Sequence, residues 1–332
     1  MIPDQTYKSI FFQNITIEGF SRAAVQSYWR IPEFKLGFDL GAQPWAFMGT
    51  PNWFISHTHM DHLLALPAYV ARRRMMLMDP PTIYLPEEVV DPVRQLLAVY
   101  TRLDRGKLPC NLVGLKPGDV VELSRELIVS AHKTYHTLPS LGYVVWERRK
   151  KLKQEYLHLP GEEIRDLRLS GVEVTYEIKM PRVAYLGDST ARGLDENPAM
   201  YDADVLITEM TFVTPEHRKE AIQKFGHLHL DDLRKRRAKF RNQLIIACIS
   251  AVGITKRKSN TPFTNRFPTC SMIDSFFGHE KTRSVLRNLT IAALQHCPYV
   301  LETGTNCSFE LSAPTPPGER CRKSGGVVTN SQ

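Results

Sequence analysis

The chain of 332 residues is long enough for one large domain or two smaller ones, and its composition is that of an ordinary globular protein. No apolar run approaches the roughly 20 residues that a membrane-spanning helix needs, and the N-terminus lacks the basic start and apolar core of a secretory signal. We therefore expect a cytoplasmic protein without membrane contact. The net charge of +8 indicates an acidic partner such as RNA, although +5 of it lies from residue 249 onward.

The first part of the chain predicts strands that lead to a group of metal-ligand residues. Residues 9–19 and 34–41 have strand-like composition, and the second of these segments ends in a glycine turn. Pro44 and Pro51 then interrupt the chain before an apolar, aromatic run that begins at Trp53.

Residues 53–62 read WFISHTHMDH, a strand-like run followed by three histidines and an aspartate. His57 and His59 are two positions apart, so they point the same way in an extended segment. Asp61 and His62 follow where the chain turns and can serve a second point close by. Imidazoles and carboxylates bind zinc and similar divalent ions, and two such ions can activate a bridging water. A histidine-rich turn formed by chance is the alternative, but four ligand-type residues in six positions favour a two-metal site.

Helices and strands alternate after this motif. Residues 62–78 have helical spacing, and we interpret the three arginines at 72–74 as a solvated helix end rather than an RNA contact. Residues 82–86 predict a strand and residues 87–103 a helix, and more strands follow. Alternation without a long linker predicts a layered α/β domain.

Two later strand ends carry ligand-type side chains. His136 follows a strand and precedes a Pro and Gly turn, which suits it to reach the metals, whereas we interpret His132 as structural or exposed. Asp188 ends the apolar strand of residues 182–190, and each of its oxygens can bind one ion. An ordinary aspartate turn is the alternative, but the first motif leads us to predict that both His136 and Asp188 are ligands.

Two further segments are candidates for catalysis and for substrate contact. Glu209 stands at the end of the predicted strand of residues 203–212, and His227 follows Gly226, where a helix stops. Residues 147–170 are charged, helical in pattern, and interrupt a run of strands. They are either a solvated insertion or an arm that grips a polyanion.

The segments HTHMDH, YHTLPSLGY, YLGDST and ADVLITEMTF, followed by GHLHLDDL, occur in that order. This order resembles ribonuclease Z, the endonuclease that trims the 3′ trailer from precursor tRNA, and it covers roughly residues 7–248. The first segment resembles the signature of the whole metallo-β-lactamase superfamily, and the combination is more specific. The resemblance implies an αββα sandwich of two facing mixed sheets with helices outside and metals at one edge.

The resemblance also implies the roles of the site residues. Two divalent ions, with Zn²⁺ expected, would be held by six side chains: His57, His59 and His136 for one ion, Asp61 and His62 for the other, and Asp188 between them. Asp61 would help to deprotonate the bridging water, and Glu209 would pair with His227, the proton donor to the leaving group. Precursor tRNA or another structured RNA would be the substrate, and the chain would form a homodimer.

Two departures from the family pattern leave other functions open. Thr208 stands where the family usually has a histidine before the glutamate, and Leu228 and His229 replace the usual residues after His227. Residues 147–170 sit where family members carry a tRNA-gripping arm but lack its Gly–Pro core. The alternatives are a hydrolase of another small ester, such as a phosphodiester, thioester or lactone, and a non-catalytic RNA-binding protein.

The non-catalytic alternative rests on the C-terminal part of the sequence. The family has a last metal-binding histidine in a pattern like HFSxRYH, but residues 249–332 show no ligand pattern and no helical period at that place. Reading the gene one base out of register from about Ala247–Cys248 permits H-(F/L)-S-S-R-Y-H followed by an amphipathic helix. We therefore expect a hydrolase domain over residues 1–248 and an aberrant, frameshifted and poorly ordered tail over residues 249–332. The alternative is a genuine variable tail, and resequencing the gene separates the two.

Overall fold

The first sheet is built from the N-terminal third of the chain. In this computed structural model, which describes residues 7–212, 225–249 and 290–291, its strands follow one another in sequence order. The first four are antiparallel and the last four are parallel. They are β1 (Lys8–Phe12), β2 (Ile15–Arg22), β3 (Gln26–Ile31), β4 (Leu36–Leu40), β5 (Asn52–Phe54), β6 (Thr82–Pro86) and β7 (Asn111–Leu115).

The second sheet also has seven strands and mixed direction, being antiparallel up to its fourth strand and parallel beyond it. Its strands are β8 (Val120–Glu122), β9 (Leu127–Lys133), β10 (Leu141–Leu152), β11 (Thr175–Tyr185), β12 (Val205–Met210), β13 (Leu244–Ile249) and β14 (Thr290–Ile291). Apart from Ile249 and β14, the predicted tail lies outside the described residues, so the frameshift and the domain boundary stay predictions.

One apolar core joins the two sheets. Along β2 buried residues alternate with partly exposed ones, as period-two side chains of a half-buried strand do. Phe38 from the first sheet stacks on Tyr185 from the second, with ring centroids 4.8 Å apart, and both belong to a cluster that contains inner-face residues of each sheet. The sheets therefore face each other, as the sequence predicts.

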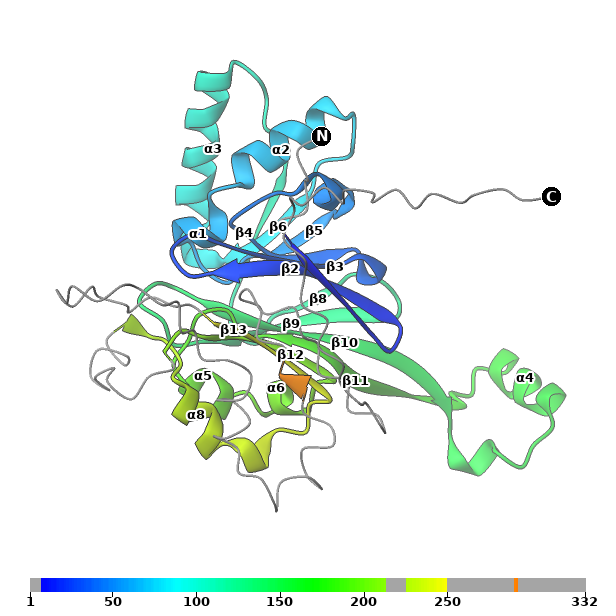
Figure 1. The fold of residues 1–332 in the computed structure, drawn as a ribbon. Coiled ribbons are helices and arrows are strands. Elements are labelled where there is room, and N and C mark those ends of the chain that lie inside the picture. Colours follow the sequence, from blue (N-terminus) through cyan, green and yellow to red (C-terminus); the bar gives the residue numbers. More distant parts are fainter. Residues whose placement is uncertain (1–6, 213–224, 250–289, 292–332) are drawn as a thin grey trace, which may run out of the picture. The chain divides into compact units, whose positions relative to one another are not determined.

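Helices cover the outer faces (Figure 1). On the first sheet, α2 (Leu66–Met75) and α3 (Val90–Asp104) bury Tyr69 and Leu97 against the outward side chains of the strands. On the second, α5 (Arg192–Asp195), α6 (Pro198–Asp202) and α8 (Leu230–Lys235) pack in the same way, through residues such as Leu194 and Met200. The predicted αββα sandwich is confirmed.

The charged insertion is a projecting hairpin. β10 and β11 stay paired from Tyr143 with Tyr185 to Leu152 with Thr175, and the loop at their tip carries η4 (Gln154–Tyr156) and α4 (Gly161–Leu169). Figure 1 shows this hairpin extending away from the two sheets. The helical pattern expected over residues 147–170 is therefore wrong for residues 147–152, which continue β10, and correct for α4.

The three arginines at the end of α2, residues 72–74, are not all exposed to solvent. Arg73 is only 4% exposed, and its guanidinium donates to the carbonyl oxygens of Met48 and Asp79. A buried guanidinium needs several acceptors, and these carbonyls supply them. The expectation of a solvated helix end is therefore wrong for Arg73, which ties α2 to the chain before it at Met48 and to the chain after it at Asp79. Among the described residues, no helix is long and apolar enough to cross a membrane.

Candidate metal centre

The first half of the site follows β5 directly. Trp53 and Phe54 are buried on opposite faces of the sheet. The chain then continues directly to His57, which is also fully buried. His59 is the N-cap of the one-turn helix α1 (Met60–Leu63), which carries Asp61 and His62. The turn that the sequence predicts after the strand is thus a single helical turn, and it directs the second pair of ligand-type side chains back to the sheet edge.

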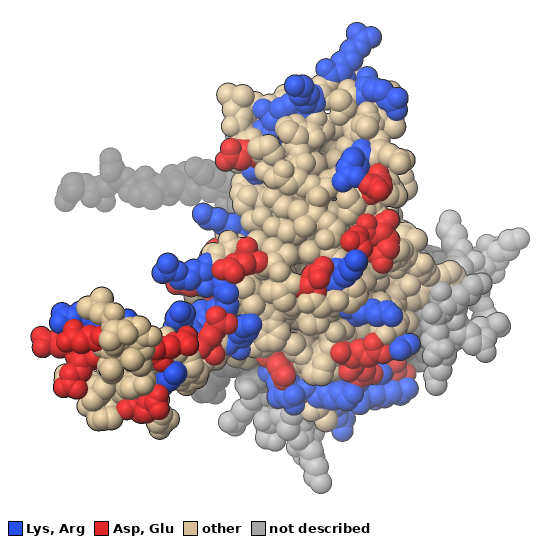
Figure 2. Space-filling view, turned by 180° about the vertical axis from the view of Figure 1, so that it is seen from behind, with Lys and Arg blue, Asp and Glu red and all other residues tan. Residues whose placement is uncertain are grey.

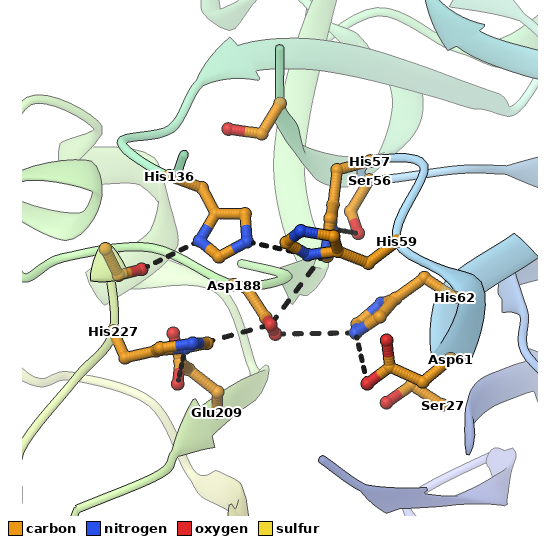
Figure 3. A network of polar contacts seen from close by, with 12 residues as sticks. Ser27, Ser56, His57, His59, Asp61, His62, His136, Asp188, Glu209 and His227 are labelled. Carbon is orange, nitrogen blue, oxygen red and sulfur yellow. Dashed lines mark hydrogen bonds and ion pairs between the residues drawn. The ribbon is translucent and has the colours of Figure 1, made fainter. Parts of the chain in front are cut away.

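Three imidazole nitrogens gather at one point (Figure 3). His59 Nδ1 lies 3.0 Å from His57 Nε2 and 3.0 Å from His136 Nε2, and one ring nitrogen from each of the three histidines lies within 4.8 Å of the other two. Tetrahedral zinc with Zn–N bonds of about 2.05 Å places its nitrogens about 3.3 Å apart. The three nitrogens therefore match one face of such a coordination shell, and His136 reaches it from the loop after β9.

A second group forms around Asp188. Its Oδ1 lies 3.7 Å from His62 Nε2, and its Oδ2 lies 3.9 Å from His57 Nε2. Asp61 Oδ2 lies 3.7 Å from the same His62 nitrogen. The carboxylate of Asp188 thus faces both groups with a different oxygen, which is the position predicted for a bridging ligand.

The pKa shifts of the histidines differ between the two groups. Burial lowers the pKa of His57 well below its ordinary value, and the neighbouring histidines lower it further; burial also lowers the pKa values of His59 and His136. Neutral imidazole is the form that binds metal. For His62, burial opposes the charged form, but Asp188 and Asp39 raise the pKa to about 9. The carboxylates therefore favour positive charge at this second position, which a divalent ion supplies.

Sequence reasoning missed Asp39, which orients the ligands from behind. This fully buried residue at the end of β4 accepts hydrogen bonds from His62 Nδ1 at 2.6 Å and from Ser56 Oγ at 2.8 Å. Because the Ser56 hydroxyl donates to Asp39, it accepts from His57 Nδ1, 3.0 Å away. Both histidines are thereby held with Nε2 free to bind. The only signal in the sequence is an aspartate before a glycine turn, in the segment FDLG.

Glu209 and His227 form a pair beside Asp188. His227 Nδ1 donates to Glu209 Oε2 at 2.9 Å, and the other carboxylate oxygen accepts from the Ser189 amide at 2.8 Å. Burial lowers the pKa of His227, but the hydrogen bond and charge of Glu209 outweigh it and raise the pKa overall. The same histidine nitrogen lies 3.8 Å from Asp188 Oδ2. The pair predicted from the resemblance is thus brought together at the edge of the site.

Gly226 sets the position of two site residues. Its φ of +68° is a left-handed conformation that favours glycine, and a Cβ there would lie 2.7 Å from His136 Cα. Its carbonyl accepts from His136 Nδ1 at 3.1 Å, which leaves Nε2 free to face His59. The glycine therefore lets the His227 loop pass close to the His136 loop.

The side chains at the departures from the family pattern contact groups other than the ligand side chains. Thr208 is buried in β12, and its hydroxyl donates to the Glu209 carbonyl at 3.2 Å. Leu228 is buried among apolar residues outside the second sheet, and His229 caps α8. The ring nitrogens of His132 form hydrogen bonds with Ser130 and Asn197, which agrees with the interpretation of His132 as a structural residue rather than a ligand. The family's last histidine would fall outside the described residues.

These donors fit two divalent cations: three imidazoles at one position, and an imidazole with carboxylates at the other. Nitrogen and carboxylate donors of this kind suit zinc. An αββα sandwich with such a set at the edge where the strand-end loops of both sheets meet defines a class, the metal-dependent hydrolases of the β-lactamase type. Residues 53–246, more than half of the chain, match the family described as the β-lactamase superfamily domain.

Proteins of similar sequence identify a narrower group within this superfamily. The tRNase Z TRZ1 of Arabidopsis thaliana is 37% identical over 241 residues, which are 72% of this chain and 86% of that protein. The nuclear ribonuclease Z of Triticum aestivum is 44% identical over 159 residues, 48% of this chain and 90% of that protein. The chloroplastic tRNase Z TRZ2 of Arabidopsis thaliana is 35% identical over 228 residues, 68% of this chain and 64% of that protein. The chain belongs to the β-lactamase superfamily, and within it to the ribonuclease Z-like proteins.

Proposed function

We propose that the chain is a zinc-dependent endoribonuclease that removes the 3′ trailer of precursor tRNA. The observation that carries the proposal is the set of three imidazole nitrogens with Asp188 facing it, in a chain that is 37% identical to a tRNase Z over 86% of that protein. A phosphodiester is a demanding substrate, because its negative charge repels a nucleophile, and paired cations offset that charge.

Six side chains would hold the two ions: His57, His59, His136, Asp61, His62 and Asp188. When bound, such ions supply an activated water and stabilise the charge that develops on the phosphate oxygens. Asp61 is positioned by the Ala24 amide, which donates to its Oδ2 at 2.7 Å, and it would accept the proton of the attacking water. Glu209 fixes Nδ1 of His227, so His227 would present Nε2–H to the leaving oxygen.

The projecting hairpin supports an RNA substrate. Lys150 and Lys151 are exposed on its strand β10, while Arg148 and Arg149 are engaged by Glu122 and Glu147. Exposed cations on a long hairpin can bind the phosphate backbone at a distance from the site. We propose that this hairpin holds the body of the RNA while the cleavage site lies at the metals.

The experiment is metal content and cleavage measured on the same preparation. In the protein with the reading frame restored we expect two zinc ions per chain and cleavage of a precursor tRNA at the trailer boundary, with much slower hydrolysis of bis(p-nitrophenyl) phosphate. The chain as written lacks the family's last histidine, so it should hold the second ion more weakly and cleave more slowly. The His57→Ala variant should lose both zinc and cleavage. Two zinc ions with hydrolysis of the small diester alone would favour the small-ester alternative, and one ion or none without cleavage would favour the non-catalytic one. A protein with the reading frame restored is the matched comparison, since it would contain the family's last histidine.

The homodimer and the cytoplasmic location implied at the outset stay predictions. Sedimentation of the zinc-loaded chain tests the first, and fractionation of cells that express it tests the second.

A further inference from the structure

A dense group of cations begins close to the site. Residues 230–241, here called the α8 cationic segment, contain six cations, Arg234, Lys235, Arg236, Arg237, Lys239 and Arg241, against two acids, Asp231 and Asp232. Its net charge of +4 exceeds the +3 of residues 1–248 as a whole. The positive charge of the hydrolase domain is thus concentrated in one short stretch.

The segment starts where the site ends. His227 faces Glu209 and Asp188, and two residues later His229 caps α8 with its Nδ1 on the Asp231 amide. The Leu230 amide donates to the Phe212 carbonyl at 2.8 Å, which holds the start of α8 against the chain that leaves β12. α8 is six residues long, so it spans about 9 Å at 1.5 Å per residue. A nucleic-acid strand in a duplex advances about 3.4 Å per phosphate, so the segment lies within a few nucleotides of the metals.

Most of these cations have a structural partner. Arg236 and Lys239 both bind Asp195 of α5, with their nearest nitrogens 2.5 and 2.7 Å from its oxygens, and Arg241 binds Asp202 at 2.5 Å. These pairs fasten α8 and the turn η5 (Arg237–Lys239) to the helices beside them.

Lys235 and Arg237 differ from their neighbours. Both are exposed, and neither makes an ion pair with an acid in the part of the chain that the structure describes. Figure 2 shows cationic side chains gathered along the lower edge of one face, where α8 lies in Figure 1, next to acidic side chains. A cation near a helix C-terminus is favoured by the helix dipole. That accounts for Lys235 in the last turn of α8 but not for Arg237, which lies beyond it.

We propose that Lys235 and Arg237 bind phosphates of the substrate RNA close to the cleavage site, so that the backbone runs along α8 as it leaves the metals. The inference rests on the proposed function for the identity of the RNA. Two separated contacts, the α8 cationic segment near the metals and the projecting hairpin far from them, would fix the RNA in one orientation. Exposed cations gain affinity by releasing counterions from the phosphates, so the contribution must depend on salt.

The test uses the zinc-loaded full chain and the double variant Lys235→Gln/Arg237→Gln, which leaves the cations that bind Asp195 and Asp202 in place. We expect KM for precursor tRNA to rise about 10-fold at moderate salt, with kcat unchanged. The slope of log Kd against log salt for fluorescent mature tRNA should fall by about 2, one unit for each lost phosphate contact. Hydrolysis of bis(p-nitrophenyl) phosphate should not change, because that molecule is too small to reach α8.

The matched control is Arg102→Gln/Lys107→Gln, which removes two exposed cations at and beyond the end of α3, outside the other sheet. It should alter neither KM nor the salt slope. If the α8 variant keeps the wild-type KM and salt slope, or if the control lowers the slope equally, the inference is overturned. If the wild-type chain cleaves no precursor tRNA yet the α8 variant alone loses salt-dependent tRNA binding, the proposed function fails and the RNA surface stands.

Discussion

The two sheets contribute to the candidate centre in different ways. The first sheet supplies His57, His59, Asp61 and His62 from one continuous segment after β5. The second supplies its residues from three separate loops and one strand, with His136 after β9, Asp188 after β11, His227 before α8 and Glu209 in β12. A continuous segment holds its geometry by local backbone structure, whereas the separate loops depend on sheet register and on contacts between loops. We therefore expect substitutions outside the ligands to disturb the residues supplied by the second sheet more than those supplied by the first.

The largest effect should come from Asp188→Ala, because the two carboxylate oxygens of Asp188 face a nitrogen of each metal group. We expect a loss of roughly 10³-fold or more in kcat, since both charge stabilisation and metal retention fail. Zinc content and precursor-tRNA cleavage check this, with circular dichroism to show that the fold persists. A variant that keeps two zinc ions and more than a tenth of the activity would contradict the bridging position.

A change outside the ligands tests the loop contacts directly. Gly226→Ala introduces a Cβ 2.7 Å from His136 Cα at a φ of +68°, so His136 and His227 must move apart. We expect about 1–3 kcal/mol of destabilisation from the backbone strain and roughly a 10²-fold loss of activity from the displacement. Urea unfolding and kinetics measure the two effects. Gly161→Ala, where a Cβ meets nothing within 4 Å, is the control and should be near neutral.

Asp39→Asn tests the orientation of the continuous segment. The Asp39 carboxylate accepts from the Ser56 amide with one oxygen and from the Ser56 hydroxyl and His62 Nδ1 with the other. An asparagine amide has only one accepting oxygen, so it cannot make both sets of hydrogen bonds. Loss of such a partner behind a ligand lowers metal affinity about 10–100-fold. Competition with a chelator measures this affinity. An unchanged zinc affinity would show that β5 and α1 fix the histidines without Asp39.

The smallest effect concerns the support of α8. Hydrogen bonds from Arg236, with those from Lys239 and Tyr201, lower the pKa of Asp195 to about 2, although burial opposes this. Because the pKa is lower in the folded chain than the ordinary value of 3.8, the charged Asp195 carboxylate stabilises the fold at pH values above 3.8. This contribution is lost as the pH falls from 3.8 through about 2. Because these groups are partly exposed, we expect Asp195→Asn to cost only about 1 kcal/mol at pH 7. In urea unfolding the difference from the wild type should shrink below pH 4; a difference that persists at pH 2 would argue against this linkage.

The continuous half of the site could be predicted from the sequence because its spacing is local. HTHMDH puts its ligand atoms close together in any strand followed by a turn. The placement of His136 and Asp188 required the family resemblance, since no local rule states which strand ends share a sheet edge. Asp39 escaped prediction because its role depends on β4 lying beside β5 and on Tyr185 approaching from the other sheet. The paired cations of α8 are also a product of tertiary contact, and the sequence shows them only as a charged helix.

The hydrogen bonds of Asp39 have a consequence for the sandwich as a whole. Its Oδ2 accepts from His62 of the first sheet's segment and from the Tyr185 hydroxyl of β11 in the second. Any sliding of one layer over the other would break the hydrogen bonds to this shared acceptor and turn His62 away from the position proposed for a metal ion. If the site binds metal as proposed, metal binding and interlayer alignment are thermodynamically linked, and each added ion should raise the unfolding temperature by an amount set by its own affinity. Metal titration followed by calorimetry would thus report on how firmly the two layers are locked together.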